Sequence, residues 1–438
     1  MNNANVLKIK TSPSYNRKTT DQGVSMSLIT KKKHITLAAA LGVSMLAAGM
    51  QPAEAKTEDG KWLIYLSLSY SGNSWQSEAA NIVKALAQTP PYDETVELVE
   101  VISGTDPQSQ ISDYESMIAN GADGIVSFPV SSNALNRTVR HGCDQGVLFF
   151  MYDATVTEQC AYNVSYITSG FGENTAQALV NELQGEGKIF LSRGVPGNSV
   201  DERHTNGAMH IFDQYPGIEV VAEYYSNWDD RTTQQETSKA LAAHPDVDGI
   251  WAQAGEYGAI QALLQADENR LVPITGENSN GFRLALANEE YQAKGLSGVS
   301  AGSPPAQSGF AFKLMMEMLE GQRESLPEDK RNIQYPLPWV SAGDVQLCEG
   351  DTFENGCNTF PEDKVPSSFV TEVFNPQLLP ELSLASALEG SPTPGATIQP
   401  LPEDVIENAP NEPGINCRSC DTPENLYELT TVEATVSP

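Results

Sequence analysis

Basic residues are scarce in this chain of 438 residues. The sequence holds 26 Lys and Arg against 57 Asp and Glu, which gives a formal net charge of −31. A surface this negative repels phosphate backbones, so the composition argues against nucleic acid as a partner. Histidine and cysteine are also few, at five and six residues, and across the chain they do not form the two spaced pairs that hold a zinc ion. We therefore expect no metal site and no cofactor.

Long hydrophobic runs are absent apart from one near the N-terminus. Ile35 to Met50 are mostly apolar, but this run is shorter than the roughly 20 residues that span a bilayer. Lys31–Lys33 precede it and the small residues around Ala53–Ala55 follow it, which is the order found in a secretory signal peptide. We therefore assign residues 1–55 to upstream sequence and a signal peptide, with translation expected to start at Met26. The protein is then expected to be exported to the periplasm, although a membrane anchor remains an alternative.

Export places the six cysteines in an oxidising compartment, where disulfides form. The simplest interpretation pairs nearest neighbours, although the sequence leaves other pairings open. The candidate disulfides then join Cys143 to Cys160, Cys348 to Cys357, and Cys417 to Cys420. The last pair has the Cys-x-x-Cys spacing of a redox or metal site, but it lies in a proline-rich tail without a strand–helix–strand pattern.

Short apolar runs alternate with amphipathic stretches from Lys61 onward, which predicts strands that alternate with helices. In the first half we expect strands at Trp62–Leu66, Val96–Ile102, Gly124–Phe128 and Val147–Tyr152. The same rhythm starts again after residue 165, with strands expected at Lys188–Leu191, Glu219–Tyr225, Gly249–Gln253, Val272–Thr275 and Gly295–Ser300. This alternation predicts an α/β fold of two doubly wound, Rossmann-like lobes with parallel sheets.

The last hundred residues differ from the rest in composition. Beyond residue 342 the chain is rich in Asp, Glu and Pro, and only Lys364 and Arg418 are basic. We expect residues 343–390 to form an irregular extension held by a disulfide, and residues 391–438 to be a disordered acidic tail.

Candidate site residues follow the predicted strands, because ligands of such sheets bind beyond the carboxyl ends of the strands. Aromatic faces there can cover the C–H face of a sugar ring, while carboxylate, amide and guanidinium groups bond its hydroxyls. Each of these residues could instead serve packing or a turn. The candidate ligand-binding residues are Asn73, Trp75, Phe128, Asp153, Arg203, Trp228, Gln253, Glu256 and Asn278.

Four segments give the chain a family resemblance. From about Lys61 to Val340 it resembles ribose-type periplasmic sugar-binding proteins, and the segments are Asp153 at a strand end, Pro196–Ser199 leading to Arg203, the Trp228–Asp230 turn and Ala242–Gln253. The resemblance implies a type I periplasmic binding protein fold, with two lobes joined by a three-strand hinge. It places residues 56–165 and 300–325 in the N-terminal lobe, and residues 166–299 and 326–342 in the C-terminal lobe.

The resemblance also implies roles for residues. Asn73 and Trp75 match the polar and aromatic ligand loop of the first lobe, Asp153 matches a carboxylate that accepts from ring hydroxyls, and Arg203 matches the arginine opposite it. Trp228 matches the second stacking aromatic residue. Phe128 and Asn278 replace an amide and an Asp of the ribose binders, which favours another sugar or a less polar solute over ribose.

The implied function is that of an exported receptor. Such a protein, usually a monomer, binds a small molecule of monosaccharide size between its lobes and hands it to an ABC permease in the inner membrane. A ligand-sensing domain for a membrane kinase or chemoreceptor would use the same binding chemistry. An enzyme is the third alternative, with Asp153 and Glu256 as a glycosidase-like pair. The usual motifs of serine hydrolases, zinc proteases and P-loop proteins are missing from the sequence, so we expect a binding protein and no catalytic residues.

Overall fold

The computed structural model describes residue 57 and residues 59–166, 168–302, 304–335, 337–351, 356–371, 377–406 and 422–429. The predicted signal peptide lies outside these residues. Every helix in the described part of the chain is too short or too polar to cross a bilayer.

Two of the three predicted disulfides are present. One joins Cys143 to Cys160 and the other joins Cys348 to Cys357, so the nearest-neighbour pairing is confirmed for these four cysteines. The third predicted disulfide is not among the bridges that the structure describes. Both Cys417 and Cys420 lie outside the described residues, so a bridge between them stays a prediction.

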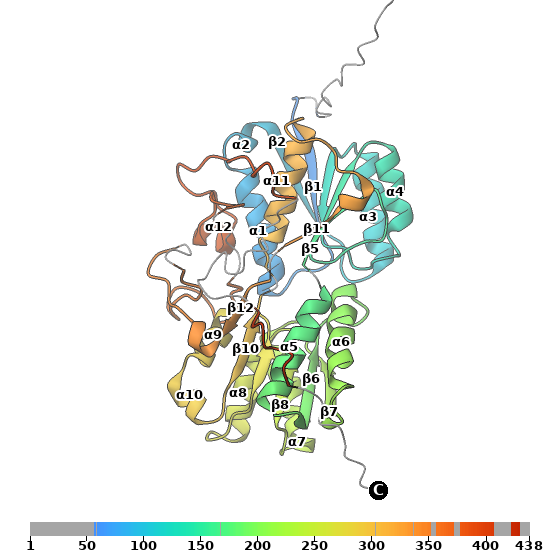
Figure 1. Cartoon of the computed structure of the whole chain (residues 1–438). Helices are drawn as coiled ribbons and strands as arrows, with labels where there is room; N and C mark the ends of the chain where they lie inside the picture. The colour runs from blue at the N-terminus through green and yellow to red at the C-terminus, as the bar shows by residue number, and fades with distance from the viewer. Residues whose placement is uncertain are drawn as a thin grey trace, which may run out of the picture. The chain divides into compact units, whose positions relative to one another are not determined.

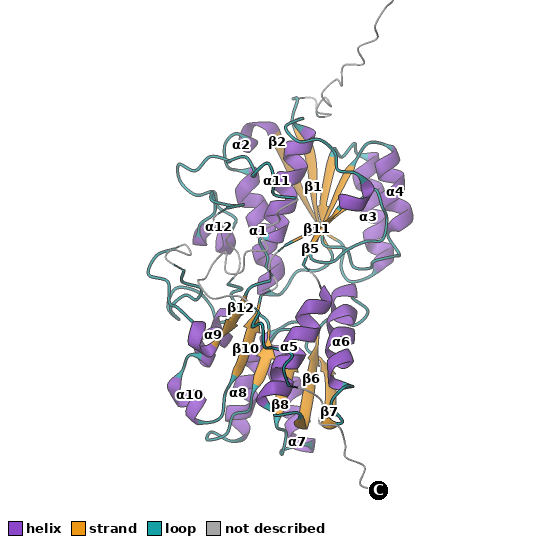
Figure 2. Cartoon of the chain, in the orientation of Figure 1, coloured by secondary structure: helices purple, strands orange, loops and turns teal. Residues whose placement is uncertain are grey.

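Six parallel strands form the sheet of the first lobe, in the order β11-β5-β4-β3-β1-β2 (Figures 1 and 2). Their bounds are β1 Trp62–Leu68, β2 Val96–Ile102, β3 Gly124–Ser127, β4 Leu148–Tyr152, β5 Tyr162–Ser165 and β11 Asn332–Gln334. The helices of this lobe are α1 Ser74–Ala87, α2 Tyr92–Thr95, α3 Pro107–Ala119, α4 Asn136–Asp144 and α11 Gln307–Leu319.

Both faces of this sheet are buried because side chains alternate along each strand. In β1, Ile64 and Leu66 pack with the apolar side chains of α1 and α11, whereas Tyr65 between them packs with those of α3 and α4. The strands therefore consist largely of consecutive apolar residues, which is the composition of a parallel sheet covered on both sides.

The second lobe repeats this arrangement, with the strand order β12-β10-β9-β8-β6-β7. Its strands are β6 Glu186–Arg193, β7 Gly217–Tyr225, β8 Gly249–Ala252, β9 Ile274–Gly276, β10 Gly298–Ala301 and β12 Trp339–Ser341. Among these strands, β12 runs antiparallel to its neighbour. The helices are α5 Thr168–Glu182, α6 Ser199–Phe212, α7 Asp230–Ala243, α8 Glu256–Ala266, α9 Asn280–Leu286 and α10 Glu289–Ala293.

The chain passes between the lobes three times: after β5, between β10 and α11, and between β11 and β12. The two-lobe α/β prediction is confirmed, but one boundary was wrong. We expected residues 326–342 in the second lobe, whereas β11 at Asn332–Gln334 pairs with β5 of the first sheet. Of this range, β12 is the strand that joins the second sheet. Strand β11 has a single apolar residue, Ile333, between two polar ones, which is too weak a pattern to assign it to a sheet from sequence.

The extension beyond residue 342 packs against both lobes. Helix α12, Leu384–Glu389, lies on α1, where the Asn81 amide donates to the Ala387 carbonyl over 2.9 Å. Apolar side chains of the extension, among them Phe360 and Phe369, belong to the same core as α1 and α11. The described residues also form two 3-10 turns, at Glu328–Lys330 and Ala342–Asp344.

The prediction that residues 391–438 are disordered was wrong for the part that the structure describes. The backbone of Leu401 donates to Glu317 of α11 over 2.6 Å, and that of Ile398 donates to the Pro90 carbonyl over 2.8 Å. Residues 422–429 run beside α5, where the Asn181 amide donates to the Leu426 carbonyl over 2.8 Å (Figure 1). Acidic composition suggested disorder, but these contacts depend on long-range packing that composition does not report.

Candidate functional site

A cavity of about 350 Å³ lies between the two lobes. Its volume is at the lower end of the roughly 300–1,000 Å³ of small-molecule sites. The first lobe contributes Tyr70, Gly72, Asn73, Ser74, Trp75, Gln76, Phe128 and Asp153. The second lobe contributes Val200, Trp228, Asp229, Asp230, Arg231, Ala254, Gly255, Glu256, Glu277 and Ser279, and the extension contributes Ser367, Ser368 and Val370.

Aromatic rings line one wall of this cavity. Trp75 packs edge-on against Phe128, with ring centroids 5.8 Å apart, and stacks on Tyr152 at 6.2 Å. Tyr70 stacks on Trp228 of the other lobe at 6.2 Å. Such rings offer flat apolar faces to the carbon skeleton of a ligand, and stacking across the lobes is complete only when the lobes approach each other.

Trp228 is held in an unusual backbone conformation. It and Asn227 both have positive φ angles, of 55° and 54°, which side chains other than Gly adopt at an energetic cost. The indole lies directly over Gly194, where an added Cβ would overlap the ring. Its Nε1 donates to the Gln253 side chain over 3.1 Å. Gly194 against the ring face and Gln253 at Nε1 therefore fix the position of the indole.

A buried polar network supports this tryptophan from behind. The Gln253 amide nitrogen donates to Asp201 over 3.0 Å, and Asp201 also pairs with Arg193 at 2.6 Å. Gln253 and Asp201 are fully buried. Because their polar atoms bond one another, the network can be buried without a large desolvation penalty and can orient the Trp228 ring.

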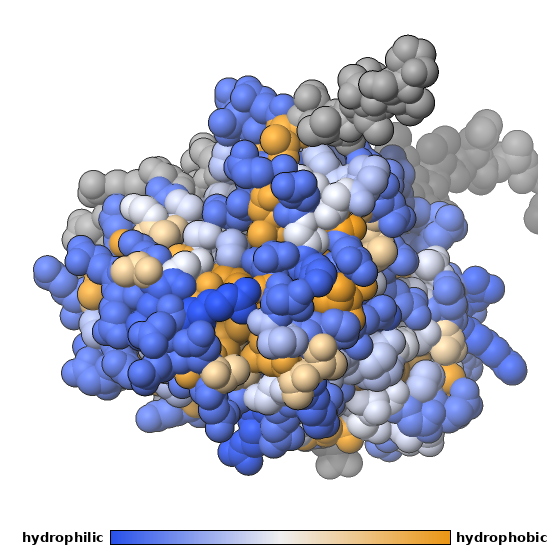
Figure 3. Space-filling model, turned by 90° about the horizontal axis from the view of Figure 1, so that it is seen from below, coloured by the Kyte–Doolittle hydropathy of each residue, from blue (hydrophilic) through white to orange (hydrophobic). Residues whose placement is uncertain are grey.

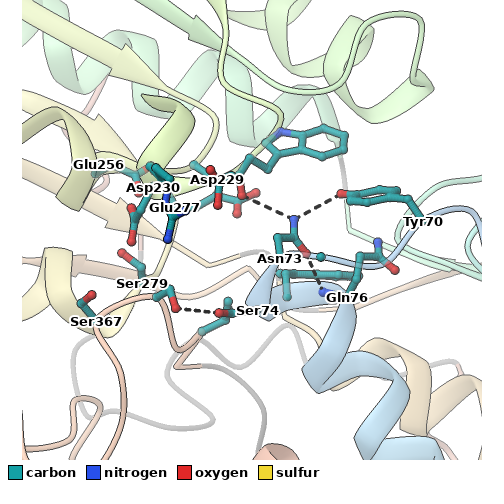
Figure 4. Close-up of a pocket in the computed structure, with 18 of the residues that line it drawn as sticks. Tyr70, Asn73, Ser74, Gln76, Asp229, Asp230, Glu256, Glu277, Ser279 and Ser367 are labelled. Carbon is teal, nitrogen blue, oxygen red and sulfur yellow. Dashed lines mark hydrogen bonds between the residues drawn. The ribbon is translucent and has the colours of Figure 1, made fainter. Parts of the chain in front are cut away.

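Polar groups of the first lobe face carboxylates of the second lobe across the cavity (Figure 4). Asn73 caps α1 by accepting from the Gln76 backbone over 2.9 Å, and its amide donates to the Tyr70 hydroxyl and to the Trp228 carbonyl. Burial raises the pKa of the Tyr70 hydroxyl well above its usual value, so this group stays protonated. Figure 4 shows Asp229, Asp230, Glu256 and Glu277 on the opposite side.

The acidic side of the cavity includes one fully buried and one half-buried carboxyl group. Glu256 at the start of α8 is fully buried, and burial raises its pKa to about 8. Burial likewise raises the pKa of Asp230 at the start of α7 to about 6. An added Cβ at Gly276 would overlap the Glu256 carboxylate, so glycine at this position leaves room for that side chain. No group of three or more His, Cys, Asp or Glu among the described residues is arranged to hold a metal ion.

The extension supplies a third side of the cavity. The Ser74 hydroxyl of the first lobe donates to the Ser368 hydroxyl over 2.7 Å, and Glu78 accepts from the Val370 backbone. On the second lobe, the Gly281 backbone donates to the Ser367 carbonyl over 2.8 Å. Residues 356–371 therefore contact both lobes beside the cavity.

Six of the nine candidate residues border the cavity: Asn73, Trp75, Phe128, Asp153, Trp228 and Glu256. Gln253 is not part of the lining, but its side chain accepts from the Trp228 indole. Arg203 lies outside the lining, where its guanidinium donates to the Thr155 hydroxyl of the first lobe over 2.7 Å. Asn278 is buried under the extension, and its carbonyl accepts from the Thr371 backbone.

The nine candidates leave out other lining residues. Tyr70, Asp230 and Glu277 follow strands or begin helices, so the rule that selected Trp75 and Asp153 could have selected them as well. Ser367 and Ser368 could not be found in this way, because they come from a segment without periodic structure that reaches the cavity only through tertiary packing.

Comparison with known proteins identifies the family. Residues 64–323 match the periplasmic binding protein domain. The xylitol-binding protein of Mycolicibacterium smegmatis is 26% identical over 255 residues, which cover 57% of this chain and 71% of that protein. The ribose import binding protein of Bacillus subtilis is 24% identical over 231 residues, which cover 52% of this chain and 73% of that protein.

Solved structures share the fold. An ABC transporter solute-binding protein from Thermobispora bispora aligns with a TM-score of 0.57 at 22% identity, and the alignment covers 78% of this chain and 98% of that one. A solute-binding protein from Bacillus halodurans with bound myo-inositol aligns with a TM-score of 0.56 at 18% identity, covering 66% and 97% of the two chains. The chain therefore belongs to the periplasmic binding protein family and is a solute-binding protein, not an enzyme.

Proposed function

We propose that this protein captures a small polyhydroxylated solute, a sugar or sugar alcohol, in the cavity between its lobes and delivers it to the permease of an ABC importer. The observation that carries the proposal is the composition of the cavity wall. Trp75 and Trp228 come from different lobes and border the same cavity, with amide, hydroxyl and carboxylate groups around them. Relatives named for xylitol, ribose and xylose support the same class of ligand.

The binding mechanism follows from where these groups lie. Contacts from both lobes are complete only when the lobes close, so a ligand stabilises the closed arrangement by its differential affinity for it. Direct contacts between the lobes, such as Arg203 with Thr155 and Asn73 with Trp228, would form in the same movement. Export through the predicted signal peptide and action as a monomer are part of this proposal.

The test is a thermal-shift and calorimetry panel of D-ribose, D-xylose, xylitol and myo-inositol with the purified protein. A ligand at about 100 times its Kd should stabilise the protein by about 2.7 kcal/mol. Trp228→Ala should weaken binding at least tenfold, or about 1.4 kcal/mol, because it removes one aromatic face. The control Ile102→Ala alters a half-exposed side chain outside the cavity and should leave binding unchanged. If no sugar, polyol or amino derivative of these stabilises the protein, the proposal fails.

Delivery is tested separately, in cells. Deletion of the gene should abolish uptake of the radiolabelled solute identified by the panel, and the wild-type gene should restore it. Normal uptake after deletion, accompanied by loss of a transcriptional or chemotactic response, would instead identify a sensing receptor.

A further inference from the structure

The charge of the cavity is strongly one-sided. Its lining includes the five carboxylates Asp153, Asp229, Asp230, Glu256 and Glu277, and Arg231 is the basic residue among the lining side chains that the structure describes. Asp229 is used structurally, since it caps α7 by accepting from the Thr232 backbone over 2.8 Å. Asp153 likewise has a partner, because it accepts from the Gln307 amide over 3.3 Å.

Glu256 provides an observation independent of the number of acidic groups. One of its oxygens accepts from the Glu277 backbone over 2.7 Å. The other oxygen, Oε2, is buried and has no hydrogen-bond partner among the described residues. A buried polar atom without a hydrogen-bond partner destabilises a protein, and more strongly if the group is charged. A donor supplied by the ligand would remove this penalty.

Asp230 adds a second negative group beside the same part of the cavity. Its Oδ1 accepts from the Gly258 backbone over 3.2 Å, and its charge raises the pKa of Glu256 further, after the larger effect of burial. Because burial raises its pKa to about 8, Glu256 is mostly protonated at pH 7 in the absence of ligand. An ammonium group beside Glu256 and Asp230 would donate to the free oxygen and favour the ionised form of both carboxyl groups, whereas a neutral hydroxyl would supply the hydrogen bond without the charge.

The aromatic wall fits the same kind of ligand. Tyr70, Trp75, Phe128 and Trp228 present ring faces or edges at the cavity. The face of an aromatic ring attracts a nearby cation as well as an apolar C–H surface. A compact molecule with hydroxyls, carbon faces and one positive charge would contact the polar, aromatic and acidic side chains that line the cavity.

We propose, building on the function proposed above, that the solute is a cationic amino-polyol, a sugar or cyclitol that carries a primary ammonium group bound by Glu256 and Asp230. The hydroxyls then bond Asn73 and the serines of the extension, and the carbon skeleton lies against the tryptophans.

The test compares matched pairs by calorimetry at pH 7: D-glucose with D-glucosamine, D-galactose with D-galactosamine, and myo-inositol with scyllo-inosamine. N-acetyl-D-glucosamine controls for size without charge. We expect at least one amine to bind ten times or more tighter than its neutral parent and its acetylated form. Glu256→Gln should reduce amine affinity at least tenfold more than it reduces the affinity for the neutral parent. The matched control Glu268→Gln removes an exposed carboxylate outside the cavity and should change neither affinity.

Each other outcome overturns the inference. If a neutral parent binds as tightly as its amine, the sugar-binding function stands and the cationic ligand class is wrong. If nothing in either panel binds, both proposals fail. The comparison within wild-type protein needs no variant, and Asp230→Asn gives a second test of the acidic side should Glu256→Gln fold poorly.

Discussion

The buried carboxyl group of Glu256 makes the stability of the unliganded protein depend on pH. Its folded-state pKa of about 8 lies above the ordinary value of 4.5 because burial disfavours the charged form. The unfolded chain releases this proton at lower pH than the folded protein does. This group therefore contributes full stability below about pH 4.5, and the contribution is lost as the pH rises through 8.

We predict that Glu256→Gln, which cannot ionise, raises the free energy of unfolding of the ligand-free protein at pH 8.5 by an amount on the order of a few kcal/mol. At pH 4.5 the difference from wild type should nearly vanish. Urea denaturation at both pH values measures it, and Glu268→Gln serves as the control. An equal difference at the two pH values would show that Glu256 titrates normally.

At the residue scale, sequence reasoning worked where local position determines the environment. Trp75 and Asp153 border the cavity because they follow β1 and β4, and strand ends are recognisable from apolar runs. It did not place Arg203, because its direction depends on the tertiary packing that brings its guanidinium to Thr155 of the first lobe. The role of Gly194 beneath Trp228 was also invisible, because the two residues are close only in the folded chain.

At the scale of elements, α11 and the extension are joined by a buried ion pair. The Lys313 ammonium lies 2.8 Å from the Glu381 carboxylate, and both side chains are about 1% exposed. Lys313 also donates to the Leu378 carbonyl over 2.8 Å. Removing one partner of such a pair leaves an uncompensated buried charge, which destabilises far more than loss of a surface pair.

We predict that Lys313→Met lowers the free energy of unfolding by about 3–5 kcal/mol. Adding Glu381→Leu should recover much of that loss, because the second substitution removes the stranded carboxylate. The matched control is Lys364→Met, which breaks the exposed pair with Asp351 and should change stability by about 0–1 kcal/mol. Chemical denaturation of the three variants checks the order, and equal effects of the two lysine substitutions would contradict it.

Elements were predicted from sequence to the extent that their periodicity was strong. Strands β1, β2 and β8 and the helices between them follow from apolar runs and caps. Strands β5, β11 and β12 were missed because they carry no run of consecutive apolar residues long enough to stand out: Asn163 and Ser165 interrupt β5, and Asn332 and Gln334 flank the one apolar residue of β11. Helix α12 lies in a proline-rich segment whose composition suggested irregular structure, and it packs on α1.

At the scale of the whole molecule, negative charge dominates the surface. The net charge is −31, and the face in Figure 3 shows mostly hydrophilic residues with smaller apolar areas between them. Like charges on a compact body repel one another and oppose folding, while salt screens that repulsion.

We predict that the melting temperature rises by several degrees when NaCl is increased from about 0.05 M to about 0.5 M at pH 7.5. Most of the rise should come at the lower concentrations, where the Debye length changes most. Differential scanning fluorimetry measures it, with KCl as the control for ion identity. A melting temperature that is constant or falls over this range would mean that surface repulsion has little effect on stability.

Two of the serines that border the cavity, Ser367 and Ser368, lie on the extension, outside the family domain that ends at residue 323. Substitutions in residues 367–370 can reshape one side of the cavity while both sheets and all three crossings stay as they are. Solute preference can therefore change through substitutions in the extension, while the residues of the two lobes and of the crossings between them stay the same. The same segment is a convenient position for changing selectivity in an engineered biosensor.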